Sequence, residues 1–153
     1  MAIERAREYL KKYNLDDEIM EFTSSSATVS EAAEAIGCSD ADIAKSLSFL
    51  VDDKPILIVV AGDKRIDNSK YKSTFSCKAR MIPFDDVEKL IGHAAGGVCP
   101  FGINDGVEVY LDTSLKSHDF IYPACGSSNS AIKLTIEKLE EVSNYLKWVD
   151  VCK

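Results

Sequence analysis

The segment Leu47-Ser48-Phe49-Leu50-Val51-Asp52-Asp53-Lys54-Pro55-Ile56-Leu57-Ile58-Val59-Val60-Ala61 decides the fold. Residues 47–51 and 55–61 are rich in β-branched and large apolar side chains, which favour strands. The polar residues 52–54 between them are typical of a turn. Two strands joined by so short a turn pair antiparallel, and we therefore expect a hairpin over residues 47–61.

Helical patterns lie on both sides of this hairpin. Before it, apolar residues recur at helical spacing over residues 3–13, and Thr28-Val29-Ser30-Glu31 has the spacing of a capping box for a helix that ends at Gly37. Ser39 can cap a short helix that carries Lys45 near its end. After the hairpin, we expect helices at residues 67–75, from residue 84 to before Gly92, and after Thr135.

Further strands are expected at residues 78–83, 107–111, 120–122, 131–134 and 148–151. Strands and helices are interleaved, but several strands follow one another through short turns. This order favours a mixed α/β (α+β) fold, in which a curled or closed mixed sheet is flanked by helices, over a doubly wound parallel sheet. Because no repeat or linker divides the 153 residues, we expect one domain over residues 1–153.

The composition indicates a globular protein of the cytoplasm. Apolar residues make up 46% and charged residues 28% of the chain, and no apolar run is long enough to cross a bilayer. The N-terminus has no apolar signal-peptide core. The five cysteines are widely spaced and the two histidines are isolated, which predicts reduced thiols, no bound metal and no cofactor.

The net charge of −7 argues against broad binding of nucleic acids such as DNA. The charge is uneven, however, because residues 64–80 contain six basic residues and a single acid, Asp67. Such a run is either a solvated surface or a patch that meets a polyanion at one place. The second interpretation suits a protein that contacts one end of a nucleic acid.

The most informative motif is the loop Gly96-Gly97-Val98-Cys99-Pro100-Phe101-Gly102. Glycines admit backbone conformations that other residues avoid, and proline restricts its neighbour, so the motif specifies the shape of the main chain. Such a loop can direct N–H groups at a carbonyl or phosphate oxygen, or it can be a tight structural turn. Lys45 is similarly open to two interpretations, a cation that holds a phosphate or carbonyl and a solvated residue at a helix end.

Together these motifs resemble the YbaK/EbsC family, which is related to the editing domain of bacterial prolyl-tRNA synthetases. The resemblance rests on Thr28–Ala33, Ile43–Leu47, Val60–Asp67, the glycine loop and Ile121–Gly126, in that order. It covers the chain from about residue 14 to residue 145, and the lysine and the glycine loop are its most specific parts.

The resemblance implies a curved, barrel-like sheet and a freestanding aminoacyl-tRNA deacylase. Members of the family hydrolyse the ester of a wrongly attached amino acid, commonly alanine or cysteine on proline tRNA. The implied partners are the 3′ end of aminoacyl-tRNA and a prolyl-tRNA synthetase, and neither DNA nor a membrane is expected. Lys45 matches the functional lysine, and the substrate-binding positions implied are Thr28, Gly96, Gly97, Val98, Pro100, Phe101, Gly102 and Gly126.

The sequence departs from the family pattern at Cys99 and His93. These two residues also suggest an alternative in which Cys99 is a nucleophile and His93 or His118 its base. A second alternative is a binding module that keeps the pocket without catalysis.

Overall fold

The structure, a computed structural model, describes residues 2–153. Its α-helices are α1 (Ala2–Lys11), α2 (Val29–Ile36), α3 (Asn68–Phe75), α4 (Val87–Ile91) and α5 (Ile136–Val142), and short 3-10 helices lie at Asp16–Glu18, Asp40–Asp42, Phe84–Asp86 and Thr113–Ser117. The strands are β1 (Met20–Glu21), β2 (Ile43–Val51), β3 (Lys54–Ala61), β4 (Glu108–Asp112), β5 (Phe120–Pro123), β6 (Ser130–Ala131), β7 (Leu134–Thr135) and β8 (Lys147–Val149). Over residues 2–153, no helix has the length and apolarity that crossing a membrane requires.

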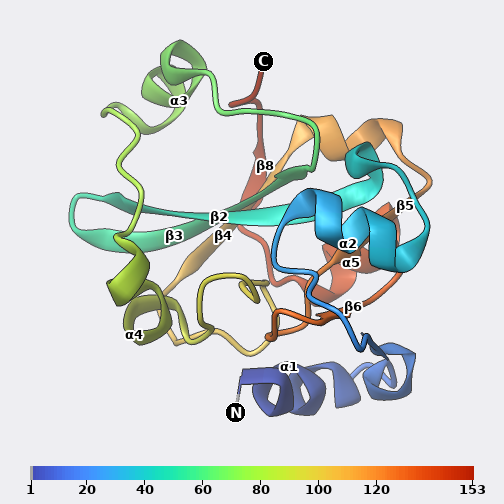
Figure 1. The fold of residues 1–153 in the computed structure, drawn as a ribbon. Coiled ribbons are helices and arrows are strands. Elements are labelled where there is room, and N and C mark those ends of the chain that lie inside the picture. The colour runs from blue at the N-terminus through green and yellow to red at the C-terminus, as the bar shows by residue number, and fades with distance from the viewer. Residues whose placement is uncertain (1) are drawn as a thin grey trace.

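Six strands form one mixed sheet in the order β7-β5-β2-β3-β4-β8, and β1 pairs with β6 in a separate two-stranded sheet. Strand β2 runs antiparallel to β3 and parallel to β5, and β4 is parallel to both β3 and β8. The large sheet curls into a half-barrel, which confirms the predicted fold class. Figure 1 shows α3 on one side of the β2–β3 hairpin and α1 and α4 on the other.

The hairpin forms as predicted and is longer than predicted. Leu47 lies opposite Ile58 and Phe49 opposite Ile56, and the pairing continues back to Ala44 opposite Ala61. The additional residues of β2 come from the segment that was expected to be helical. Asp40–Asp42 is a single 3-10 turn beginning after Ser39, and the chain is extended from Ile43 onward. The prediction that Lys45 lies near a helix end was therefore wrong, because pairing of Ile43 and Ala44 with β5 draws the chain into the sheet.

Two other predicted strands differ from the structure. Residues 78–83 make only an isolated bridge, between Met81 and Phe49. The expected strand at residues 131–134 is divided into β6 and β7, which belong to different sheets. The division occurs because the chain changes partner here. Ser130 and Ala131 pair with β1, whereas the N–H of Ile132 donates to the Pro123 carbonyl, in register with the pairing of β7 and β5.

Two apolar clusters cover the two faces of the hairpin. The larger contains Ala44, Val59 and the buried loop residue Phe101, together with residues of α1, α4 and α5. The second contains Val60, Phe49 and Tyr71 of α3. Because successive side chains of a strand point to opposite faces, Lys45, which lies opposite Val60, belongs to the face of the second cluster.

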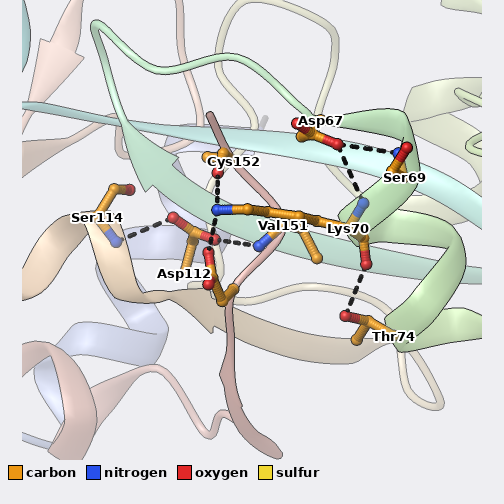
Figure 2. A network of polar contacts seen from close by, with 9 residues as sticks. Asp67, Ser69, Lys70, Thr74, Asp112, Ser114, Val151 and Cys152 are labelled. Atoms are coloured by element: carbon orange, nitrogen blue, oxygen red, sulfur yellow. Dashed lines mark hydrogen bonds and ion pairs between the residues drawn. The ribbon is translucent and has the colours of Figure 1, made fainter.

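A polar network around Asp112 fastens the C-terminal segment to that second face (Figure 2). The buried Asp112 carboxylate accepts hydrogen bonds of 2.9 Å from the N–H groups of Ser114 and Val151. Lys70 of α3 donates to the Cys152 carbonyl over 2.8 Å. The network therefore ties α3 and the end of the chain together, close to the loop that contains Lys64.

Candidate functional site

A cavity of about 480 Å³ lies along β2, between the start of α2 and the loop that follows α4. Its wall is mostly apolar. Four of the predicted site residues line it, namely Thr28, Lys45, Gly96 and Val98. Ser46, Ser48, Met81, Ile82 and Phe84 also line it.

The cavity opens onto an edge of β2 that is paired only at its two ends. At one end Ile43 and Ala44 pair with β5. At the other end, the N–H of Leu50 donates to the Arg80 carbonyl and the N–H of Ile82 donates to the Ser48 carbonyl. Residues 45–47 lie between these contacts, and no described strand pairs with them on this edge.

Lys45 directs its ammonium to the Lys64 carbonyl, which accepts a hydrogen bond from it. Burial lowers the pKa of Lys45, and the carboxylate of Asp63 acts against that shift. The partly buried ammonium has no acidic side chain within salt-bridge distance among the described residues. Lys45 thus lines the cavity, and the hydrogen-bond acceptor of its ammonium is a neutral carbonyl.

The first part of the glycine loop is packed main chain against main chain. Gly96 has a φ of +95°, in the region that favours glycine. Gly97 accepts a hydrogen bond from the N–H of Gly126 over 3.0 Å. A Cβ at residue 97 would lie 2.6 Å from the nitrogen of Ser127. Gly97 and Gly126 thus hold the loop against the segment after β5, and neither lines the cavity itself.

The second part of the loop turns away from the cavity. Phe101 is fully buried in the larger apolar cluster, and its ring lies 6.3 Å from that of Tyr9 in α1. Pro100 and Gly102 line a different cavity, beside α1. The structure therefore brings Gly96 and Val98 to the lysine, and it does not bring Pro100, Phe101 or Gly102 there.

Thr28 has a structural role that the sequence predicted. Its Oγ1 accepts a hydrogen bond of 3.1 Å from the N–H of Glu31, and the Glu31 carboxylate accepts one from the N–H of Thr28. This capping box begins α2 and places the first turn of the helix in the cavity wall.

Cys99 and His93 lie side by side, but both are fully buried outside the cavity wall. The Cys99 sulfur is 3.6 Å from His93 Nε2, and this nitrogen is 2.6 Å from the Phe101 carbonyl. A carbonyl only accepts, so Nε2 carries the proton and cannot take one from the thiol. Burial raises the pKa of Cys99 to about 12 and lowers the pKa of His93. The remaining candidate base, His118, bonds instead to Asp42 over 3.1 Å. This arrangement does not support the cysteine-nucleophile alternative.

Sequence reasoning missed Ser46, Met81 and Phe84. Ser46 was hidden because residue 45 was assigned to a helix end, and correct strand boundaries would have placed 44, 46 and 48 on one face. Met81 and Phe84 are 59% and 78% exposed, unusual for large apolar side chains, and they line the cavity. No local pattern in the sequence distinguishes them from core residues.

Comparisons with known proteins identify the family of the chain. Residues 23–142 match the model of a family described as aminoacyl-tRNA editing domain. The protein YwhH of Bacillus subtilis, described as uncharacterized, is 51% identical over 154 residues, which cover 100% of this chain and 98% of YwhH. A proline–tRNA ligase of Shouchella clausii is 33% identical over 109 residues, which cover 71% of this chain and 19% of the ligase.

One solved structure, described as a candidate trans-editing enzyme for prolyl-tRNA synthetase, is similar over nearly its whole length. Its TM-score is 0.88 at 27% sequence identity, and the match covers 99% of this chain and 97% of that one. The similarity in fold and the matched family agree with the resemblance found in the sequence.

Proposed function

The chain belongs to the family of aminoacyl-tRNA editing domains, which makes it an aminoacyl-tRNA deacylase, and we propose that its substrate is alanyl- or cysteinyl-tRNA for proline. In this proposal residues 1–153 act as one freestanding domain in the cytoplasm, and prolyl-tRNA synthetase is the enzyme whose errors it corrects. The observation that carries the proposal is the largely apolar cavity that Lys45 shares with Gly96 and Val98.

A separate editing site is needed because small side chains are hard to distinguish. A difference of one methylene changes binding by only about 1–3 kcal/mol, so a synthetase cannot reject the smaller amino acid by binding alone. A second cavity that admits the wrong product and hydrolyses it corrects the deficit. The apolar wall supports a small, weakly polar side chain as the group that enters.

Lys45 is proposed to supply the positive charge of the site. Its ammonium would exchange the Lys64 carbonyl for the phosphate of the terminal adenosine or for the ester carbonyl. An ammonium bonded only to a neutral carbonyl gains more from an anion than one already paired with a carboxylate, because no opposite charge yet balances its own.

The main chain at Gly96 and Val98 is proposed to orient the ester and to stabilise the oxyanion. No described residue bonds to the N–H of either one, whereas the N–H of Gly97 already donates to the Ala94 carbonyl. With Cys99 buried, the attacking group in this mechanism is water or a hydroxyl of the substrate.

The basic run of residues 64–80 is proposed to meet the phosphates near the tRNA end. Five of its six basic residues, Arg65, Lys70, Lys72, Lys78 and Arg80, are exposed, and Met81 of the cavity wall follows at once. This position would let the acceptor end enter the cavity along a positive surface while the rest of the acidic protein keeps the tRNA at a distance.

A deacylation screen tests the proposal. Purified protein is incubated with proline tRNA carrying alanine, cysteine or proline, each labelled at the tRNA end. Release of alanine or cysteine above the spontaneous rate, with proline retained, is the expected result. Binding of aminoacyl-tRNA without release of any of the three would favour the non-catalytic binding module instead.

A further inference from the structure

Ser46 lies at the centre of the open edge of β2, and all of its polar groups are without a partner among the described residues. In an antiparallel pair, every second residue exchanges hydrogen bonds with the partner strand. Because the N–H of Gly62 donates to the Ile43 carbonyl, residues 45, 47 and 49 are the ones that bond to β3. Residues 44, 46, 48 and 50 therefore direct their N–H and C=O groups to the other edge. The bonds of Ser48 and Leu50 to residues 82 and 80 agree with this alternation.

On this edge, the N–H, the carbonyl and the hydroxyl of Ser46 form no hydrogen bond to any described residue. No described residue bonds to its N–H or its carbonyl, and its hydroxyl oxygen is buried without a hydrogen-bond partner. Unpaired polar groups of this kind cost about 1–3 kcal/mol each where water is excluded, so three at one residue of a cavity wall point to a ligand.

The unpaired part of the β2 edge, between Ala44 and Ser48, has room for only one residue to pair with it. Strand β5 ends at Pro123, and Ile82 resumes the pairing at Ser48. A peptide strand longer than the three residues 45–47 would collide with one of these segments. The occupant must therefore offer one donor and one acceptor at the spacing found within one amino acid.

We propose that the aminoacyl group of the substrate binds as a one-residue extension of the sheet, opposite Ser46 on the open edge of β2. Its α-ammonium donates to the Ser46 carbonyl, and its ester carbonyl accepts from the Ser46 N–H. These are the two bonds that a directly opposed pair exchanges in an antiparallel ladder. The inference rests on the proposed function, since it takes the ligand to be an aminoacyl ester.

This pose also orients the amino-acid side chain. Directly opposed residues direct their side chains to the same face of a sheet, so the substrate side chain would lie beside that of Ser46. That face is the one that carries Ala44 and, in the cavity wall, Val98. The Ser46 hydroxyl, which bonds to no described residue, can turn toward the ligand by rotation about its Cα–Cβ bond.

Binding measurements without turnover test the pose. The ligand is 3′-deoxy-3′-(alanylamino)adenosine, in which an amide replaces the ester, and its propionyl counterpart lacks only the α-ammonium. We expect the propionyl ligand to bind the wild-type protein at least about tenfold more weakly, because the hydrogen bond from a charged donor is missing. Equal dissociation constants for the two ligands would overturn the pose.

Substitutions of Ser46 provide the second arm. Ser46→Pro removes the N–H that points away from β3, so the hairpin keeps its own bonds, and binding of the alanyl ligand should fall at least about tenfold. Ser46→Ala is the matched comparison, because it keeps both main-chain groups and removes only the hydroxyl, so the alanyl ligand should bind it more tightly than it binds Ser46→Pro. A Ser46→Pro protein that melts like wild type and binds equally well contradicts the pose. If the two ligands differ as expected while no aminoacyl-tRNA is hydrolysed, the deacylase proposal fails and the pose stands.

Discussion

At the scale of single residues, the site separates groups that face the cavity from groups that only hold the loop in place. Lys45 lines the cavity, and its ammonium is bonded to the Lys64 carbonyl. Cys99 and His93 are residue types with familiar catalytic roles, but both are fully buried and neither lines the cavity. Burial thus decides which of the reactive side chains can act.

Cys99 should neither act as the catalytic nucleophile nor react readily with an alkylating reagent. Cys99→Ser should keep deacylation of alanyl- or cysteinyl-tRNA within about threefold of wild type, because the thiol faces the Phe101 carbonyl and not the cavity. A pKa of about 12 leaves almost no thiolate at neutral pH, so the native Cys99 should resist iodoacetamide, as mass spectrometry of labelled peptides can measure. Rapid labelling at Cys99, or loss of activity in the serine variant, would restore the cysteine alternative.

The charge of Lys45 should be lost at a lower pH than that of an ordinary lysine. Burial lowers its pKa below 10.5, and the ammonium is the form present below that pKa. The ligand is 3′-deoxy-3′-(propionylamino)adenosine 5′-phosphate, which has no α-ammonium that could titrate in this range. Its affinity should therefore decline as the pH rises from 8 to 10.5, and decline less in Lys45→Arg, whose guanidinium stays charged. An affinity that is constant across this range in the wild type would argue against a role for the charge.

At the scale of elements, the loop of residues 96–102 is set by contacts between main chains. Gly97→Ala should reduce deacylation at least about tenfold, because its Cβ would lie 2.6 Å from the Ser127 nitrogen and would displace the loop from Gly126. Gly37→Ala is a matched control, since Gly37 has a φ of +88° and nothing within 4 Å of the added carbon. It should lose about 1 kcal/mol of stability through backbone strain and keep its activity. Urea unfolding and the deacylation rate separate the two effects.

Elements whose signals are local could be predicted from the sequence. The hairpin over residues 47–61, the capping box at Thr28 and the helix after Asp67 all depend on neighbours in the chain, and all are present. The strand that includes Lys45 could not be predicted in this way. Its first residues are held by β5, almost 80 positions later, and a contact of that range leaves no local pattern.

Only part of the candidate site could be predicted from the sequence. The resemblance pointed to Lys45 and to the glycine loop, and of these Lys45, Gly96 and Val98 line one cavity, whereas Gly97 does not. The open edge at Ser46 could not be foreseen, because it arises where β5 ends at Pro123 and the segment before Ile82 joins β2. The unpaired edge depends on where three separate segments lie: β2, β5 and the residues before Ile82.

At the scale of the whole molecule, the uneven charge should govern how tRNA is bound. Reversing two exposed lysines of the basic run, Lys72→Glu with Lys78→Glu, should weaken deacylation of aminoacyl-tRNA and reduce the slope of log kcat/KM against log salt by about one for each phosphate that is no longer neutralised. The control reverses two exposed lysines elsewhere, Lys11→Glu with Lys147→Glu, for the same change in net charge. A short aminoacyl-adenosine ligand should bind both double variants like wild type. Equal losses in the two variants would show that only net charge matters.

The most direct measurement is the single-turnover rate at which wild type and Lys45→Ala release alanine or cysteine from proline tRNA. Lys54→Ala, an exposed lysine at the far end of the same hairpin, serves as the control. We expect the wild type and the control to release the amino acid at the same rate, and Lys45→Ala to be slower by at least about tenfold, the effect of losing one charge-assisted hydrogen bond. A Lys45→Ala protein that is folded and as fast as wild type would contradict the assignment of this cavity as the deacylation site.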